Sequence, residues 1–170
     1  MPRFRILPER SQVWIEARSS IHPIHGQAEG LSGSLDVEFD GDGLDLTTTP
    51  EISVELPVER LKSGNRVEDA EMMRRIDARK YPTIRGMVRD MKAQGEDGRY
   101  LVAGDLTFHG VTQTVEGEVT LSRPDDRTVV IEGTQEFDIR DYKVAPPKIL
   151  MLKVHPEVQV RIRLEAVSDT

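Results

Sequence analysis

The sequence predicts an all-β protein, an extended antiparallel β-barrel of about eight strands with one short helix inserted around residues 67–79. Apolar and polar residues alternate with a period of two through most of the chain, which is typical of strands with one dry and one wet face. Turn residues separate these runs, and one stretch rich in helix formers interrupts them. Because about eight antiparallel strands must protect their edges, we expect the sheet to close on itself.

The strands are expected in a regular succession along the chain. A short one opens at Phe4 and Ile6, and the acidic, glycine-rich segment 40–45 is expected to be a turn. Pro57 lacks an N–H and indicates an edge or the end of a ladder. The clearest alternation is the last. The expected strands cover residues 13–18, 34–39, 51–58, 82–88, 100–108, 115–121, 129–139 and 158–165.

The segment GDLTFHGVTQTVEGEVTL, residues 104–121, predicts two antiparallel strands around a tight turn at His109 and Gly110. A histidine at a hairpin tip raises the question of chemistry. The simplest interpretation is a solvated turn residue, with Gly110 supplying the difficult backbone angle. The hairpin is therefore expected to be a wall of the barrel.

Residues 67–79 contain no Gly or Pro and predict the single helix. Asn65 is a candidate N-cap, and Pro82 stops the helix before the next strand. Met72, Met73 and Ile76 share a face at helical spacing. Ordinary packing is favoured over a ligand gate for these side chains.

Four glycines, Gly86, Gly104, Gly117 and Gly133, lie inside predicted strands. Glycine weakens a strand and often marks a bend or a close approach by another group. Strand curvature explains them most simply, and the alternative is that missing side chains leave room for a ligand.

Composition limits the function classes. The chain has 170 residues, no cysteine and a formal net charge of −7. One domain over residues 1–170 is the default for this length. Disulfides and thiolate metal sites are excluded, and the acidic balance argues against a nucleic-acid partner. No apolar run is long enough to cross a bilayer, and the first residues lack the apolar core of a signal peptide, so a cytoplasmic location is expected.

Three motifs resemble those of the YceI-like family, a lipocalin-like group of polyisoprenoid-binding barrels. The most specific is GDLTFHGVT at 104–112, and the others are F-x-I-x-P-x-x-S-x-V at 4–13 and IDARKYPTI at 76–84. The chain departs from the family pattern in Arg10 for a usual His and in Ile15 and Ile76 for a usual Phe. The resemblance implies a lipocalin-like barrel around an apolar pore that holds a long lipid, and a homodimer is a reasonable expectation.

The inward faces of the predicted strands supply the candidate ligand-binding residues. We expect this cavity lining to comprise Val13, Ile15, Val37, Phe39, Val54, Leu56, Val102, Leu106, Phe108, Val119, Val160 and Ile162. Some of them must be plain core below the cavity. The polar cluster Arg140, Asp141 and Tyr142 is a candidate cavity mouth, with a surface ion-pair cluster as the alternative.

No cofactor, catalytic residue or metal site is predicted. His22 and His25 are separated by Pro23 and would point to opposite faces of a strand, and no His-Glu-x-x-His pattern is present. The favoured function is a carrier or store for a long-chain isoprenoid or similar fatty lipid. The alternatives are a small-molecule enzyme that uses the barrel cavity and a partner-binding module with a filled barrel.

Overall fold

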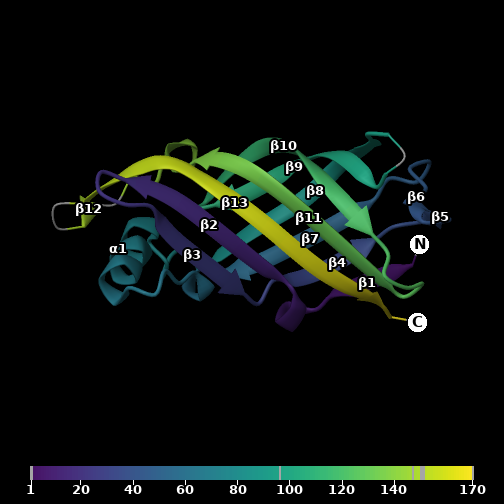
Figure 1. The fold of residues 1–170 in the computed structure, drawn as a ribbon, viewed down its shortest axis with the longest axis horizontal. Helices are drawn as coiled ribbons and strands as arrows, with labels where there is room; N and C mark the ends of the chain where they lie inside the picture. The colour runs from purple at the N-terminus through teal and green to yellow at the C-terminus, as the bar shows by residue number, and fades with distance from the viewer. Residues whose placement is uncertain (1, 96, 147, 150–151, 170) are drawn as a thin grey trace.

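A single large antiparallel sheet dominates the computed structural model, which describes residues 2–95, 97–146, 148–149 and 152–169 (Figure 1). Its longest strands are β8 to β11 and β13, and a separate two-stranded hairpin joins β5 to β6. The strands are β1 (Arg3–Ile6), β2 (Gln12–Ser19), β3 (Ile24–Glu29), β4 (Ser32–Asp36), β5 (Phe39–Asp40), β6 (Gly43–Leu44), β7 (Glu51–Pro57), β8 (Thr83–Ala93), β9 (Arg99–Phe108), β10 (Val111–Ser122), β11 (Thr128–Asp138), β12 (Lys148–Ile149) and β13 (Leu152–Ser168).

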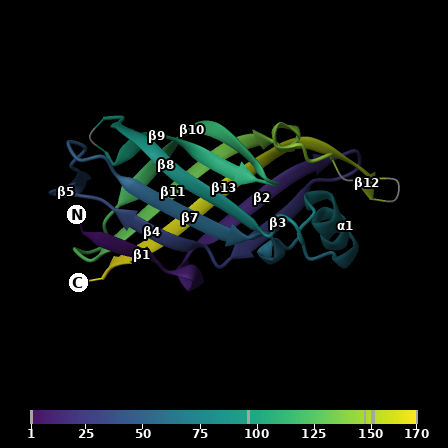
Figure 2. The ribbon, with the colours of Figure 1, turned by 180° about the vertical axis from the view of Figure 1, so that it is seen from behind.

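The sheet closes into a barrel. Its strand order is β1-β4-β7-β8-β9-β10-β11-β13, and β1 pairs back onto β13 through Phe4 and Ser168. The earlier part of β13 pairs instead with β2, which carries β3 on its other side. The short 3-10 helix η1 (Pro8–Arg10) separates β1 from β2. Both strands pair with β13, so they lie one after the other along the same side of it. The predicted all-β barrel is confirmed, as seen from the front and from behind (Figures 1 and 2).

The sequence interpretation missed strand β3. Residues 24–29 read IHGQAE, in which only Ile24 and Ala28 are apolar inward positions and Gly26 stands between them. The alternation of apolar and polar residues in this run is too weak to predict a strand. Strand β13 is also longer than the predicted 158–165, because its ladder continues past an irregularity between Val154 and Val158.

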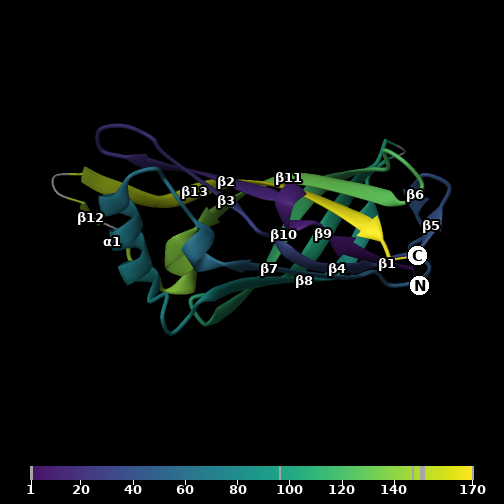
Figure 3. The same cartoon turned by 90° about the horizontal axis from the view of Figure 1, so that it is seen from below.

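The two ends of the barrel differ in what covers them. Helix α1 (Arg66–Ile76) and the 3-10 helices η2 (Val58–Arg60) and η3 (Ile139–Tyr142) gather at one end, which we call the helical end (Figure 3). The β5–β6 hairpin and both chain termini lie at the other end, which we call the terminal end.

Helix α1 begins as the sequence predicts and ends earlier. The Asn65 side chain accepts hydrogen bonds from the N–H groups of Val67 and Glu68, which confirms it as the N-cap. The predicted end at residue 79 is wrong, because Asp77 takes a left-handed conformation (φ 56°) and its N–H bonds the carbonyl oxygens of Met73 and Arg74. This C-cap stops the helix at Ile76.

The terminal end is filled by a packed core. Buried side chains from opposite walls meet there: Phe4, Leu35, Val37, Tyr100, Leu121, Val129 and Ala166. The β5–β6 hairpin covers them, since the N–H of Leu44 donates to the Tyr100 hydroxyl at 2.9 Å. The Phe39 ring packs edge-on against Phe4 at 5.6 Å, and the Arg123 guanidinium lies 3.9 Å from the Phe39 ring centroid.

Strands β10 and β11 separate toward the helical end. Their ladder covers only Val119–Ser122 against Val130–Gly133, although β10 begins at Val111 and β11 continues to Asp138. The divergence widens the barrel on this side. Beyond Gly133, β11 still pairs with β13 but has no ladder partner on its β10 side.

Candidate ligand-binding site

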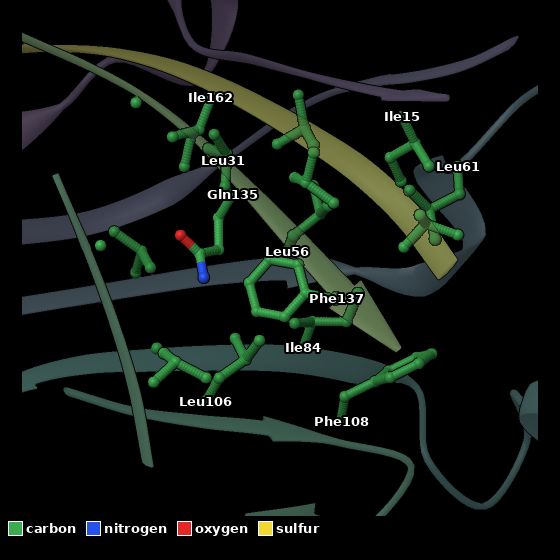
Figure 4. Close-up of a pocket in the computed structure, with 18 of the residues that line it drawn as sticks. Ile15, Leu31, Leu56, Leu61, Ile84, Leu106, Phe108, Gln135, Phe137 and Ile162 are labelled. Carbon is green, nitrogen blue, oxygen red and sulfur yellow. The ribbon is translucent and has the colours of Figure 1, made fainter. Parts of the chain in front are cut away.

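A cavity of about 460 Å³ occupies the barrel toward the helical end (Figure 4). Its volume falls within the range of small-molecule sites, roughly 300–1,000 Å³. Inward positions of nearly every strand supply its wall, and most are apolar. The aliphatic and aromatic wall residues include Ile15, Leu31, Val54, Leu56, Leu61, Ile84, Val88, Val102, Leu106, Phe108, Val119, Phe137, Val158, Val160 and Ile162.

The structure brings most of the predicted lining residues together. Ten lie on the cavity wall: Val13, Ile15, Val54, Leu56, Val102, Leu106, Phe108, Val119, Val160 and Ile162. Val37 and Phe39 do not, and their predicted position is corrected here. Both belong to the terminal end, where Val37 is buried in the filled core and Phe39 packs over Phe4.

The four strand glycines all lie on the cavity wall. They also sit where another group comes close. A Cβ on Gly104 would stand 2.4 Å from the Met87 carbonyl oxygen, and one on Gly117 would stand 2.8 Å from Gln135 Oε1. The glycines thus permit tight strand approach and keep the wall thin, so the two explanations drawn from the sequence describe one arrangement.

Helix α1 forms the wall at the helical end. Met72 and Ile76 line the cavity, so their packing face is also a cavity face. Glu68 and Asp69 lie beside them, and Asp69 accepts hydrogen bonds from the N–H and the hydroxyl of Ser63, both at 2.8 Å. Lys62 is the one cationic residue on the described wall. The polar rim is therefore mainly acidic.

The predicted mouth residues occupy three different environments. Arg140 is exposed and pairs with Asp138 at 2.6 Å and with Glu157 at 3.9 Å, in a separate surface hollow. Asp141 is exposed, and its carbonyl oxygen accepts from Gln113 Nε2. Only Tyr142 lines the cavity.

Tyr142 is buried, with 3% of its surface exposed, and its hydroxyl has no hydrogen-bond partner within the described part of the chain. Its ring lies 5.8 Å from that of Phe108. Burial, and secondarily the charge of Asp141, raises the pKa of Tyr142 to about 12. The hydroxyl thus stays protonated at neutral pH and can donate a hydrogen bond.

His109 is not the solvated turn residue that the sequence suggests. The turn itself is as expected, with left-handed His109 (φ 56°) and Gly110 (φ 71°) as in a type I′ hairpin. The imidazole is half-buried, lies edge-on to Tyr81 at 4.9 Å, and donates from Nδ1 to the Tyr142 carbonyl oxygen at 3.0 Å. It ties the hairpin tip to η3, which positions Tyr142.

Gln135 is a polar wall residue that the sequence interpretation overlooked. Its amide points into the cavity between Leu106 and Ile162 in Figure 4. It lies in β11 beyond the end of the β10 ladder, and no hydrogen bond holds its amide to any described residue. The sequence pattern could have predicted its inward position, because strand alternation places residue 135 on the same face as Ile131, Gly133 and Phe137.

No cluster of three or more potential metal ligands occurs among the described residues. His22 lies in the β2–β3 turn and His25 near the start of β3, and both are exposed. Within the same residues, no helix is both long and apolar enough to span a bilayer.

The described residues thus form a closed antiparallel barrel around a cavity whose wall is mostly apolar. The chain belongs to the YceI-like family, since the model for the YceI-like domain matches residues 4–166. Among curated proteins no match was found.

Solved structures share the fold. BcnA from Burkholderia cenocepacia superimposes with a TM-score of 0.78 at 20% identity, over 95% of this chain and 99% of that one. A polyisoprenoid-binding domain from Saccharophagus degradans, implicated in plant cell wall breakdown, gives 0.77 at 15% identity over 99% of both chains. The YceI protein of Campylobacter jejuni gives 0.68 at 15% identity, over 89% of this chain and 88% of that one.

Proposed function

We propose that this protein binds a long-chain isoprenoid or similar amphiphilic lipid inside the barrel and acts as a carrier or store without catalysis. The observation that carries the proposal is the continuous apolar wall from Ile131 and Leu164 to Met72 and Ile76 of α1. A hydrocarbon chain has no polar handle along its length, so such a wall is sufficient to hold it. The structural likeness to a polyisoprenoid-binding domain supports the same ligand class.

The size of the cavity supports a medium-length chain. At about 30 Å³ per group, 460 Å³ has room for about 15 carbon-sized groups. Burial of that many methylenes is worth on the order of 12 kcal/mol before the cost of ordering the chain. We expect the rest of a longer chain to extend beyond the cavity.

Two alternatives from the sequence have less support. A filled-barrel partner module requires a solid interior, and the cavity takes the place of one. An enzyme would need a polar cluster in the lumen, whereas Gln135 and Tyr142 are neutral and the Tyr142 hydroxyl holds its proton to about pH 12. A cytoplasmic location and a homodimer stay predictions, and light scattering after size exclusion measures the second.

Solvent extraction followed by reloading tests the proposal. Protein purified from its native host and extracted with organic solvent should release a long-chain lipid in stoichiometric amount, identified by mass spectrometry. The extracted protein should then take up added polyprenol. Clean extracts together with no uptake would contradict the proposed function.

A further inference from the structure

One uncharged polar side chain, Gln135, points into a lumen that is otherwise mostly apolar. Tyr142 also lines the cavity, but its hydroxyl is buried and has no partner among the described residues. Gly117 makes room for the amide, because any larger residue would place a Cβ 2.8 Å from Gln135 Oε1. The fold thus accommodates a polar side chain at position 135. Leucine or valine at this position would be sufficient if the ligand were a plain hydrocarbon.

A lumen filled with hydrocarbon alone would leave the Gln135 amide unsatisfied. Removing an amide from water without a compensating hydrogen bond is unfavourable, and this penalty would act against a chain that is apolar throughout. A ligand with a carbonyl or hydroxyl at the level of Gln135 removes the penalty, because a carboxamide both donates and accepts.

The charges near the cavity disfavour an anionic group. Glu68 and Asp69 line the helical end, and Lys62 is the one cationic residue among the described lining residues. The Arg140 guanidinium is committed to Asp138. A diphosphate would therefore meet mainly carboxylates, with Lys62 as the single cationic residue on the described wall.

We infer that the ligand is an uncharged amphiphile, with a hydroxyl, ketone or similar neutral group that hydrogen-bonds the Gln135 amide inside the barrel. This inference rests on the proposed function and narrows its ligand class. Apolar contacts alone would let the lipid slide along the lumen. The hydrogen bond to Gln135 therefore fixes the position of the lipid chain along the barrel.

Competition for solvent-extracted protein tests the inference. The three probes are geranylgeraniol, the matched hydrocarbon without the hydroxyl, and geranylgeranyl diphosphate, and native mass spectrometry counts each complex from an equimolar mixture. The wild-type protein should favour the alcohol over the hydrocarbon by about three- to tenfold, the range expected for one net hydrogen bond. The diphosphate should bind most weakly.

Variants locate the effect. In Gln135→Leu the preference for the alcohol should disappear, while binding of the hydrocarbon stays equal or improves. Gln135→Met should behave in the same way and guards against misfolding of the first variant, which a thermal melt checks. The matched control is Gln159→Leu, on the exposed face of β13, where the preference should stay as in the wild type.

The outcomes separate the two proposals. Equal uptake of alcohol and hydrocarbon by the wild type, or an unchanged preference in Gln135→Leu, would overturn the inference and leave lipid binding intact. Preferred uptake of the diphosphate would also overturn it and would point to the Arg140 hollow. Uptake of none of the three probes would overturn the proposed function itself.

Discussion

The terminal and helical ends of the barrel are built from the same strands but have different interiors. Along β9, Tyr100 is buried at the terminal end, whereas Val102 and Leu106 are half-buried on the cavity wall. Along β11 the same change occurs between Val129, which has no exposed surface, and Phe137. The alternation of apolar and polar residues thus determines which side chains point inward. Whether these side chains are buried in a packed core or line the cavity depends on the opposite wall of the barrel.

Truncating a leucine at each end should give the sharpest contrast. Leu35→Ala removes a fully buried side chain from the filled core and should lower the free energy of unfolding by about 2–5 kcal/mol. Leu106→Ala removes one that already borders the cavity, so fewer contacts are lost and the decrease should be about 1 kcal/mol. Urea unfolding of both variants measures the difference, and equal losses would contradict the contrast between the ends.

Replacing a valine with a larger residue should destabilise the protein at the terminal end and should reduce lipid uptake at the helical end. Val129→Phe overfills a packed site and should destabilise the protein by about 1–3 kcal/mol. Val102→Phe projects into the cavity, so stability should hold while uptake of polyprenol falls by about tenfold or more. Thermal melts and lipid uptake by both variants test this pair. Full uptake by a stable Val102→Phe would show that the ligand lies elsewhere.

The sequence could predict the strands and the inward faces, because both follow from a period of two. It could not predict the division between core and cavity. Val37 and Val54 are the same residue type on inward positions, yet Val37 is buried in the core and Val54 lines the cavity. The difference depends on residues far apart in the chain, such as Phe39 and Arg123, which cover the terminal end and have no counterpart in the local pattern.

The position of Gln135, in contrast, could be predicted from the local pattern. Its inward position was readable from alternation in β11, but a polar residue in an apolar face looks like a break in the pattern. The separation of β10 from β11 makes the position tolerable, and that separation is a property of the whole sheet. Functional polar groups are expected where local patterns fail.

Removing the Tyr142 hydroxyl should have a smaller and favourable effect on stability. Tyr142→Phe deletes a buried donor that has no partner among the described residues, so the ligand-free protein should be unchanged or more stable by up to about 1 kcal/mol. A rise of about 2–4 °C in the melting temperature would correspond to that upper value. A clear drop would mean that the hydroxyl is satisfied in the free protein.

The smallest effect concerns the surface pair beside the cavity. The hydrogen bond from Arg140, assisted by its charge, holds the pKa of Asp138 below its usual range. A group with a depressed folded pKa stabilises the fold above its unfolded pKa, about 3.9, and the contribution disappears as the pH falls through the folded value. Asp138→Asn keeps the cap of η3 and removes the charge.

The urea midpoint of Asp138→Asn should therefore lie slightly below that of the wild type at pH 7, and the two should converge as the pH falls through the lowered pKa of Asp138. Because the pair is exposed, the difference at pH 7 should also shrink in high salt. A gap that does not narrow as the pH falls into the acid range would assign the effect to lost capping instead of lost charge.

The native mass spectrum of the protein, before and after removal of lipid, tests the central claim most directly. We expect one long-chain lipid per chain before extraction, none afterwards, and recovery of the one-to-one complex when polyprenol is added to the wild type but not to Val102→Phe. A spectrum that shows only bare protein under every condition would contradict the account.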